Sequence, residues 1–236
     1  MSDTNPLSAF PIIKRWPAKN PGVIQLYSFP TPNGVKISAA LEELGLDYEA
    51  HRVTLSDDDV KSPEFLSLSP NNKIPALIDP NGPDGKPIGL FESGAILIYL
   101  GEKTGKLYGS NERERLEILQ WLMFQMGGVG PMLGQLGFFY KFAGKDIEDP
   151  RPRERYINEA KRLFNVIDKQ LEGREWLVGD YSIADLALAP WLTTIDKFYE
   201  ATEVTSFGDF KNVVAYVDRF NARPAVQKAW NIPPRG

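Results

Sequence analysis

Short apolar runs alternate with helix-like stretches in the first half of the chain. The strand candidates are the apolar or alternating runs at residues 23–29, 47–55, 74–78 and 88–91. The helix candidates between and after them are residues 35–44, 63–68 and 93–103. The last two strand candidates are separated by a segment dense in Gly, Pro, Asn and Asp, which predicts an antiparallel hairpin. This order predicts a mixed sheet with helices packed on its faces.

The second half of the chain contains no convincing strand pattern. Its apolar spacing predicts helices over residues 112–126, 152–172, 183–199 and 209–222. The glycines and proline of the GGVGP segment, residues 127–131, should interrupt the first of these helices. The expected organisation is an extension (1–22), an α/β domain (23–104), a linker (105–110) and an all-α domain (111–236).

The composition leaves little nucleophilic or metal chemistry to the side chains. The chain of 236 residues has no cysteine and one histidine, His51. Without cysteine there is no disulfide framework, no thiolate metal cluster and no protein thiol nucleophile. A Ser-His-Asp triad or a multi-histidine zinc site would have to be built on His51 alone, which lies among polar neighbours typical of a non-catalytic surface position. We therefore expect no metal site.

Charge and hydropathy exclude two further classes of partner. The chain has 27 Lys and Arg against 31 Asp and Glu, a net charge of −4, and no basic run, so we expect no nucleic-acid partner. No apolar stretch approaches the ~20 residues of a membrane span. Residues 1–22 lack the pattern of a secretory signal, so a cytoplasmic location is expected. This proline-containing extension is compatible either with a segment lying across the folded body or with disorder.

The first candidate site is the turn Thr31-Pro32-Asn33-Gly34 between a strand and a helix. Free backbone N–H groups and the helix dipole favour an anion at such a helix start. In thioredoxin-type proteins this turn holds a reactive C-x-x-C pair, and here Thr31 and Gly34 stand at the two cysteine positions. The alternative interpretation is a plain turn in which Asn33 caps the helix.

The second candidate site is the segment Ser69–Ala76, in which Pro75 opens a strand. A proline is tolerated there because it donates no ladder hydrogen bond. If the Ile74–Pro75 bond is cis, the preceding backbone can pair with an extended ligand. The alternative is an ordinary trans proline at the start of an edge strand, and the sequence leaves the isomer open.

The third candidate site is Glu92-Ser93, at the start of an apolar helix. A helix N-terminus binds a carboxylate, and the Glu92 carboxylate can receive an adjacent ammonium. An α-amino acid headgroup carries both of these charges side by side. The alternative interpretation is that Ser93 is only the helix cap.

The order and spacing of these segments resemble the glutathione transferase family across residues 23–230. The resemblance rests on TPNG at 31–34, SPNNKIPAL at 69–77, LFESGAILIYL at 90–100 and YSIADLALAPW at 181–191. It implies a thioredoxin-like N-terminal domain that binds glutathione, an all-α C-terminal domain that supplies the second substrate's pocket, and a homodimer. The TPNG and SPNNKIPA forms are most similar to the bacterial nu-class group, whose members look like glutathione-dependent disulfide-bond reductases.

The resemblance also implies a glutathione-binding set in the first domain. Glu92 and Ser93 would hold the γ-glutamyl headgroup, and the backbone of Ile74 would bind the cysteinyl unit, with Pro75 cis. Lys73, beside that strand, would meet the glycine carboxylate. The chain departs from the family in the loop before Pro63, where three consecutive aspartates stand, so a glutathione contact from this loop is not expected to carry over.

Two further residues are implied to act at the sulfur, and one from the helical domain at the ligand. Thr31 and Asn33 would face the glutathione thiol as catalytic residues. Arg155 matches an arginine that reaches glutathione, although Arg151 and Arg153 crowd the same segment and arginines of this kind usually lie on a solvated face.

The resulting functional hypothesis is a glutathione-dependent disulfide-bond reductase that uses glutathione thiolate at the Thr31-Pro32-Asn33 turn. One alternative is a glutathione transferase that conjugates electrophiles or reduces peroxides. Its apolar pocket would be lined by Phe124, Met132, Phe138, Phe139 and Tyr140. Another alternative is a non-catalytic binding or regulatory module that keeps the transferase fold. The expected partners are glutathione and a small disulfide or electrophile.

Overall fold

The computed structural model describes residues 5–235, which form two compact units. The first unit takes in the described residues up to Thr104 together with those from Pro224 onward, and the second is Gly105–Arg223. The C-terminal segment therefore packs with the first unit, a return that the local sequence pattern did not predict. No helix in the described part of the chain is long and apolar enough to span a membrane.

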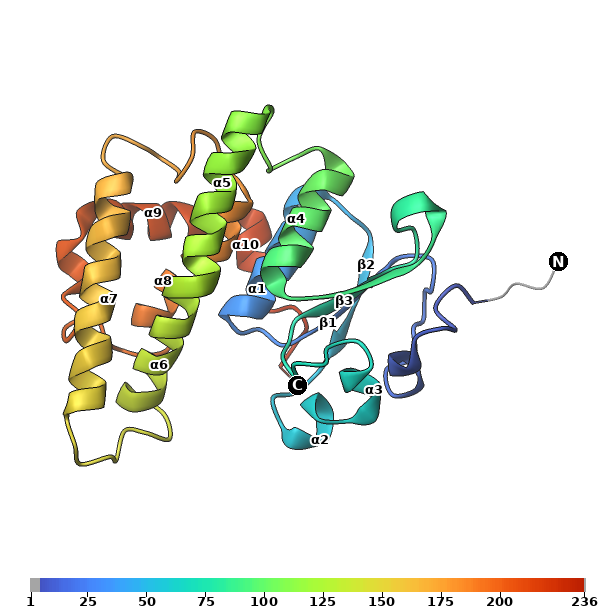
Figure 1. The fold of residues 1–236 in the computed structure, drawn as a ribbon, viewed down its shortest axis with the longest axis horizontal. Helices are drawn as coiled ribbons and strands as arrows, with labels where there is room; N and C mark the ends of the chain where they lie inside the picture. The colour runs from blue at the N-terminus through green and yellow to red at the C-terminus, as the bar shows by residue number, and fades with distance from the viewer. Residues whose placement is uncertain (1–4, 236) are drawn as a thin grey trace. The chain divides into compact units, whose positions relative to one another are not determined.

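The first unit is built on a four-stranded mixed sheet with the order β2-β1-β3-β4 (Figure 1). The strands are β1 (Ile24–Ser28), β2 (Tyr48–Arg52), β3 (Ala76–Asp79) and β4 (Ile88–Phe91). β1 pairs with β2 in parallel and with β3 in antiparallel orientation, and β3 pairs with β4 in antiparallel orientation. The predicted mixed sheet and hairpin are confirmed.

Helices and an apolar cluster bury both faces of the two central strands. On one side α1 (Pro32–Leu44) packs against α4 (Ser93–Thr104) and α10 (Pro224–Ala229). The segments that contribute to the cluster on the other side include η1 (Pro11–Lys14), α2 (Asp57–Val60) and α3 (Pro63–Leu66). Every residue of β1 and β3 is buried as a result, which explains why their sequences do not alternate between apolar and polar. A further short helix, η2, is Pro83–Gly85.

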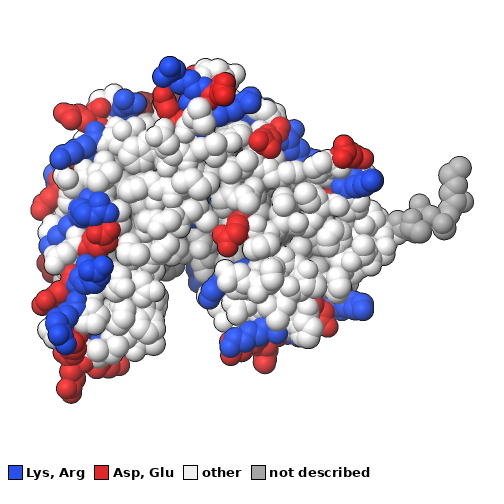
Figure 2. All heavy atoms as spheres, in the orientation of Figure 1, with Lys and Arg blue, Asp and Glu red and all other residues white. Residues whose placement is uncertain are grey.

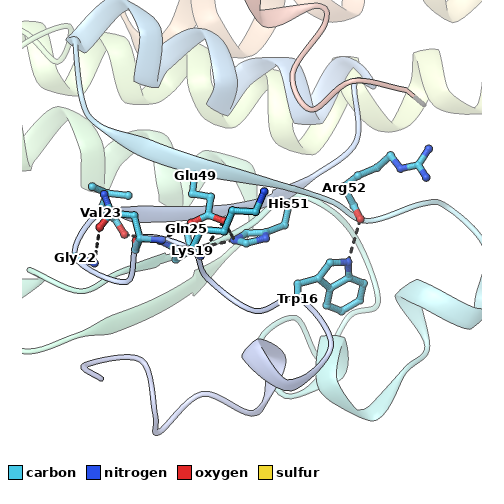
Figure 3. A network of polar contacts seen from close by, with 9 residues as sticks. Trp16, Lys19, Gly22, Val23, Gln25, Glu49, His51 and Arg52 are labelled. Atoms are coloured by element: carbon cyan, nitrogen blue, oxygen red, sulfur yellow. Dashed lines mark hydrogen bonds and ion pairs between the residues drawn. The ribbon is translucent and has the colours of Figure 1, made fainter. Parts of the chain in front are cut away.

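The N-terminal segment is packed onto the first unit from residue 5 onward. Leu7 and Ile12 are fully buried in the apolar cluster. Its hydrogen bonds reach the edge strand β2: Trp16 Nε1 donates to the carbonyl of Arg52 at 3.0 Å, and the Lys19 backbone N–H donates to Glu49 Oε2 at 2.9 Å (Figure 3). Of the two expectations for the extension, the one in which it lies across the body is therefore correct for these residues. It also covers an edge strand that would otherwise be open to pairing.

The second unit is all-helical. Its helices are α5 (Glu112–Phe124), η3 (Gln125–Val129), α6 (Gly130–Tyr140), α7 (Arg151–Gln170), α8 (Ile183–Lys197), η4 (Phe207–Asp209) and α9 (Lys211–Asn221). The predicted interruption after α5 is a single π-helical segment, η3, beyond which the chain continues as α6. Acidic and basic side chains are interspersed over α7 (Figure 2), as in the pair Arg162–Glu159 at 2.7 Å.

A buried carboxylate joins three parts of the second unit. Asp185, in the first turn of α8, accepts hydrogen bonds from the backbone N–H of Ser182 at 2.9 Å and of Leu177 at 3.1 Å. It also accepts from the hydroxyl of Tyr216, on α9, at 3.0 Å. Burial raises the pKa of Asp185 to about 6, against the effect of these donors. At neutral pH the carboxylate is ionised and satisfies donors that no water can reach.

We expect Asp185→Ala to destabilise the protein by about 3–4 kcal/mol, because several buried donors lose their only strong acceptor at once. Ser182→Ala, which removes a helix cap and one of the donors to Asp185, at 3.2 Å, should cost about 1 kcal/mol. Urea denaturation followed by circular dichroism measures both values. Equal losses in the two variants would contradict the assignment of Asp185 as the link between these segments.

Candidate functional site

The register of the sheet brings the three predicted segments together at one end of the strands. Tyr27 of β1 lies opposite Ala76 of β3, and Ala76 lies opposite Phe91 of β4. β4 ends at this row, β3 begins there, and β1 ends one residue beyond it, at Ser28. Three segments therefore emerge at the same end of the sheet: the turn after β1, the residues before β3 and the residues after β4. The candidate site consists of these three segments.

The turn after β1 leads directly into α1. Thr31 is the helix cap: its Oγ1 accepts from the backbone N–H of Gly34 at 3.3 Å. The alternative in which Asn33 caps the helix is wrong, because the helix begins at Pro32 and Asn33 lies in its first turn. Proline is favoured at the first helical position, where its missing N–H is no loss. Thr31 Oγ1 uses a lone pair in this bond, and its own hydrogen has no acceptor among the described residues.

Gly34 explains why this turn holds no second cysteine. A Cβ atom placed on Gly34 would lie 1.9 Å from the carbonyl oxygen of Phe29 and 2.6 Å from Ser28 Oγ. Both neighbours belong to the strand end that precedes the helix, and one of them is backbone. No residue with a side chain fits here without displacing that backbone, so the turn in its present form excludes cysteine at this position.

The Gly34→Ala variant should therefore lose about 2–3 kcal/mol of stability, because the added methyl overpacks a rigid strand end. The Gly127→Ala variant is the matched control, since no atom lies within 4 Å of an added Cβ there. It should be neutral or slightly stabilising, because alanine is the better helix former. Thermal and urea denaturation of the two variants would check this. A stable Gly34→Ala protein would show that the turn has room to adjust.

The segment before β3 is a closed turn followed by a cis proline. Ser69 Oγ donates to the carbonyl of Lys73 at 2.8 Å, and the backbone N–H of Asn72 donates to the carbonyl of Ser69 at 2.9 Å. The Ile74–Pro75 peptide bond is cis, so the trans alternative is wrong. Ile74 and Pro75 are buried, whereas Lys73 is exposed and its ammonium is open to a ligand.

The residues after β4 form the start of α4. The backbone N–H of Ile96 donates to the carbonyl of Glu92 at 3.0 Å, so Glu92 is the residue from which the helix begins. Glu92 is exposed, and its φ of 70° lies in the left-handed region, which costs about 1 kcal/mol or more for a residue with a Cβ. Such positions concentrate at binding sites, where the surroundings hold them. Ser93 is buried directly beside Glu92.

The structure adds a charged residue that the sequence interpretation missed. Lys36 of α1 is fully buried, and its Nζ lies 3.2 Å from Ser93 Oγ. Burial lowers the pKa of Lys36 to about 7, and the nearby Glu92 carboxylate partly opposes this effect. The available signal was a single cation in the second turn of α1, inside an otherwise uncharged run from Gly34 to Leu41.

The comparisons with known proteins agree with this geometry. Residues 22–102 match the glutathione S-transferase N-terminal domain, and residues 138–224 match the C-terminal domain of the same family. The chain belongs to the glutathione transferase family. Its fold, a thioredoxin-like domain followed by an all-α domain, is the one that the sequence resemblance implied.

Individual relatives are similar over nearly the whole of this glutathione transferase. It is 46% identical to "Disulfide-bond oxidoreductase YfcG" of Escherichia coli, over 88% of this chain and 94% of the relative. A Burkholderia graminis glutathione transferase structure with two glutathione molecules bound per subunit is 59% identical, with a TM-score of 0.97 and coverage of 100% and 99%. A Pseudomonas putida structure with one glutathione disulfide per subunit is 58% identical, with a TM-score of 0.95 and coverage of 96% and 99%.

The three arginines at the start of α7 in this transferase differ in their surroundings. Arg151 is paired with Asp149 at 2.6 Å, and Arg153 Nη2 donates to the carbonyl of Lys145 at 3.1 Å. Arg155 is exposed on α7 and makes no hydrogen bond within the described residues. Its role at the ligand stays a prediction.

Among the apolar candidates for an acceptor pocket, Phe138 is exposed and packs edge-on against Phe139, with 4.9 Å between the ring centroids.

Two other segments singled out by the sequence are structural. His51 is buried rather than on the surface: its Nε2 lies 2.8 Å from Gln25 Oε1 (Figure 3), and its ring stacks on Tyr27. Burial lowers the pKa of His51, so the imidazole is neutral at pH 7. In the acidic loop, Asp59 pairs with Arg15 at 2.6 Å and accepts from the Thr54 hydroxyl at 2.7 Å. This loop is tied to the N-terminal segment.

Proposed function

We propose that this glutathione transferase reduces disulfides, taking both reacting thiols from glutathione. The observation that carries the proposal is the turn after β1, which offers a hydroxyl donor and a helix N-terminus but no thiol. The chain has no cysteine at all, and the backbone leaves no room for one at Gly34, the second of the two cysteine positions of such a turn. The thiol has to be borrowed, and the name and bound ligands of the relatives indicate from which molecule.

The headgroup of glutathione fits the start of α4. The γ-glutamyl group carries an ammonium and a carboxylate on one carbon. The exposed Glu92 carboxylate receives the ammonium, while the Ser93 hydroxyl and the N-terminal N–H groups of α4 receive the carboxylate. The backbone of Ile74 lies at the same edge for the cysteinyl unit, and the exposed Lys73 ammonium for the glycine carboxylate.

The turn after β1 would then activate the sulfur. A free thiol with a pKa near 8.5 is only a few per cent thiolate at pH 7. The Thr31 hydroxyl hydrogen and the amide of Asn33, in the first turn of α1, stabilise the thiolate by hydrogen bonding. Each unit by which the pKa falls corresponds to about 1.4 kcal/mol of preference for the charged form. The N-terminus of α1 acts in the same direction.

Thiol–disulfide exchange in two steps accounts for all atoms and electrons. The first glutathione thiolate attacks one sulfur of the substrate disulfide, which gives a glutathione mixed disulfide and releases one substrate thiolate. A second glutathione thiolate attacks the glutathione sulfur of that mixed disulfide, which releases the other substrate thiolate and forms glutathione disulfide. Two glutathiones supply the two electrons, so the protein needs only to bind, orient and activate, and no metal takes part.

The Thr31→Val variant tests the catalytic assignment, because it keeps the shape of the side chain and removes the hydroxyl. We expect kcat/KM for reduction of a small glutathione mixed disulfide to fall by about 10- to 100-fold, the value of a hydrogen bond to a charged group. Asn33→Ala should give a smaller loss in the same direction. Turnover is followed by coupling glutathione disulfide formation to glutathione reductase and NADPH.

Thr31→Ser is the matched control, since it retains both the hydroxyl and the helix cap, and it should keep most of the activity. Denaturation of each variant separates lost capping from lost catalysis. A wild-type protein that does not exceed the solution rate would refute the proposed reductase. Electrophile and peroxide substrates assayed in parallel would show whether conjugation or peroxide reduction is the main activity instead. Failure of a folded protein to bind glutathione resin would favour a non-catalytic module.

We also propose that the transferase acts as a homodimer in the cytoplasm. Large apolar side chains are exposed in each unit, namely Phe91 (39%) in the first and Met123 (53%) and Leu116 (56%) in the second. Exposed apolar side chains of this size are suited to a protein interface. A cytoplasmic location supplies the reduced glutathione that the reaction consumes. Light scattering in solution tests the dimer.

A further inference from the structure

Lys36 lies where burial makes a positive charge unfavourable. Lys36 lies in α1, which packs against α4 and α10. None of the Lys36 side chain is exposed. Its Nζ atom lies 3.2 Å from Ser93 Oγ, the hydroxyl at the start of α4. The lysine therefore lies directly behind the residues to which the proposed function assigns the glutathione headgroup.

The protonation state of Lys36 determines which way the Ser93 hydroxyl can point. An ammonium has three donors and no acceptor, so Ser93 Oγ must accept from it, and the hydroxyl hydrogen then points away from the lysine. A neutral amine has a lone pair and can accept from Ser93 instead. In that state the hydroxyl hydrogen is taken up inside the protein and is not offered to a ligand.

We propose that Lys36 is a positioning residue whose protonation turns the Ser93 hydroxyl toward the α-carboxylate of glutathione, so that binding of the headgroup takes up a proton at Lys36. This inference rests on the proposed glutathione site at Glu92 and Ser93. The ammonium also places a positive charge behind the carboxylate in a region of low dielectric, where a charge acts more strongly than it does in water. Lys36 does not need to touch the ligand.

The other charged groups near α1 do not take the role proposed for Lys36. Glu92, at the start of α4, is the one carboxylate that acts on the pKa of Lys36. The remaining charged groups on the packed elements have partners of their own: Glu42 with Lys228 of α10, Lys103 of α4 with Asp79, and Arg235 with the Pro30 carbonyl. Glu43 and Glu102 complete the set on α1 and α4. The bound ammonium of the ligand would engage Glu92 and leave Lys36 to the carboxylate.

The sign of the resulting pH dependence follows from the pKa of Lys36. In the free protein that pKa is lowered to about 7 by burial, and a bound carboxylate stabilises the charged form and raises it. Below the free-state pKa the lysine is already protonated, and affinity does not depend on its titration. Above it, binding must first supply a proton, so affinity falls by about fivefold between pH 7 and pH 8.

Isothermal titration calorimetry with S-methylglutathione tests the proposal, because this ligand keeps the headgroup and has no thiol to titrate. Titrations at about pH 8 in two buffers of different ionisation enthalpy give the number of protons taken up on binding. Wild-type protein should take up close to one proton more than Lys36→Met. The amine of the ligand titrates equally in both proteins, so the difference isolates Lys36.

Lys36→Met should also bind S-methylglutathione about 100-fold more weakly at pH 6.5, with no loss of affinity from pH 7 to pH 8 beyond that of the ligand's own amine. This variant should fold well, since an apolar side chain of similar length suits a buried site. Lys103→Met is the matched control: it removes the lysine of α4 that pairs with Asp79 at 2.9 Å, and it should retain both the wild-type affinity and the proton uptake.

The outcomes separate the two proposals. Equal proton uptake by wild type and Lys36→Met would overturn the role of Lys36 while leaving the glutathione site intact. If neither the wild-type protein nor Ser93→Ala binds S-methylglutathione at any pH, the proposed glutathione site itself is overturned. If Lys36→Met impairs folding, the wild-type affinity still tests the proposal: a loss between pH 7 and pH 8 no larger than the titration of the ligand's own amine would overturn it.

Discussion

The pairing of β1 with β3 and of β3 with β4 is the constraint on which the site depends. Residues from three distant parts of the chain form the candidate site only because Tyr27, Ala76 and Phe91 lie in one row across the sheet. A shift of one residue in this register would turn every side chain of a strand to the opposite face. Both faces of β1 and β3 are buried, so such a shift would put side chains of the wrong size against the neighbours on each face, overpacking some positions and leaving cavities at others. The packing of the core therefore fixes the geometry of the edge.

Much of this arrangement is predictable from the sequence because its signals are local. The hairpin follows from a segment dense in turn formers, and the break after α5 follows from glycines and a proline. The spacing of apolar residues predicts that α1 begins at Val35, which is too late, because Thr31 and Pro32 start the helix by capping. Features that depend on distant contacts were missed or left open. The return of α10 to the first unit is one example, and the burial of His51 against Tyr27 is another.

The turn after β1 shows how packing restricts the chemistry of a site. A thioredoxin-type turn can carry cysteines only where the backbone admits a side chain, and the Phe29 carbonyl leaves no such room at Gly34. The same close approach brings the first turn of α1 against the end of β1, which aims the helix N-terminus at the edge of the sheet. The conformation that favours an anion there therefore also excludes a thiol at Gly34. An anionic sulfur at this turn has to belong to the ligand.

The buried lysine beside Ser93 illustrates the converse, a group that packing alone would not select. Burying an ammonium costs several kcal/mol even after the protein relaxes around it, and the lowered pKa of Lys36 is a direct expression of that cost. An apolar residue at this position would stabilise the unliganded protein. The cost is smallest when an anion is bound nearby, because the ammonium then has a further negative charge in the same low-dielectric region. Because protonation and binding are linked, the free energy by which the ligand stabilises the charged form of Lys36 also makes the ligand bind more tightly. A cation that destabilises the free protein therefore strengthens its complex with an anionic ligand.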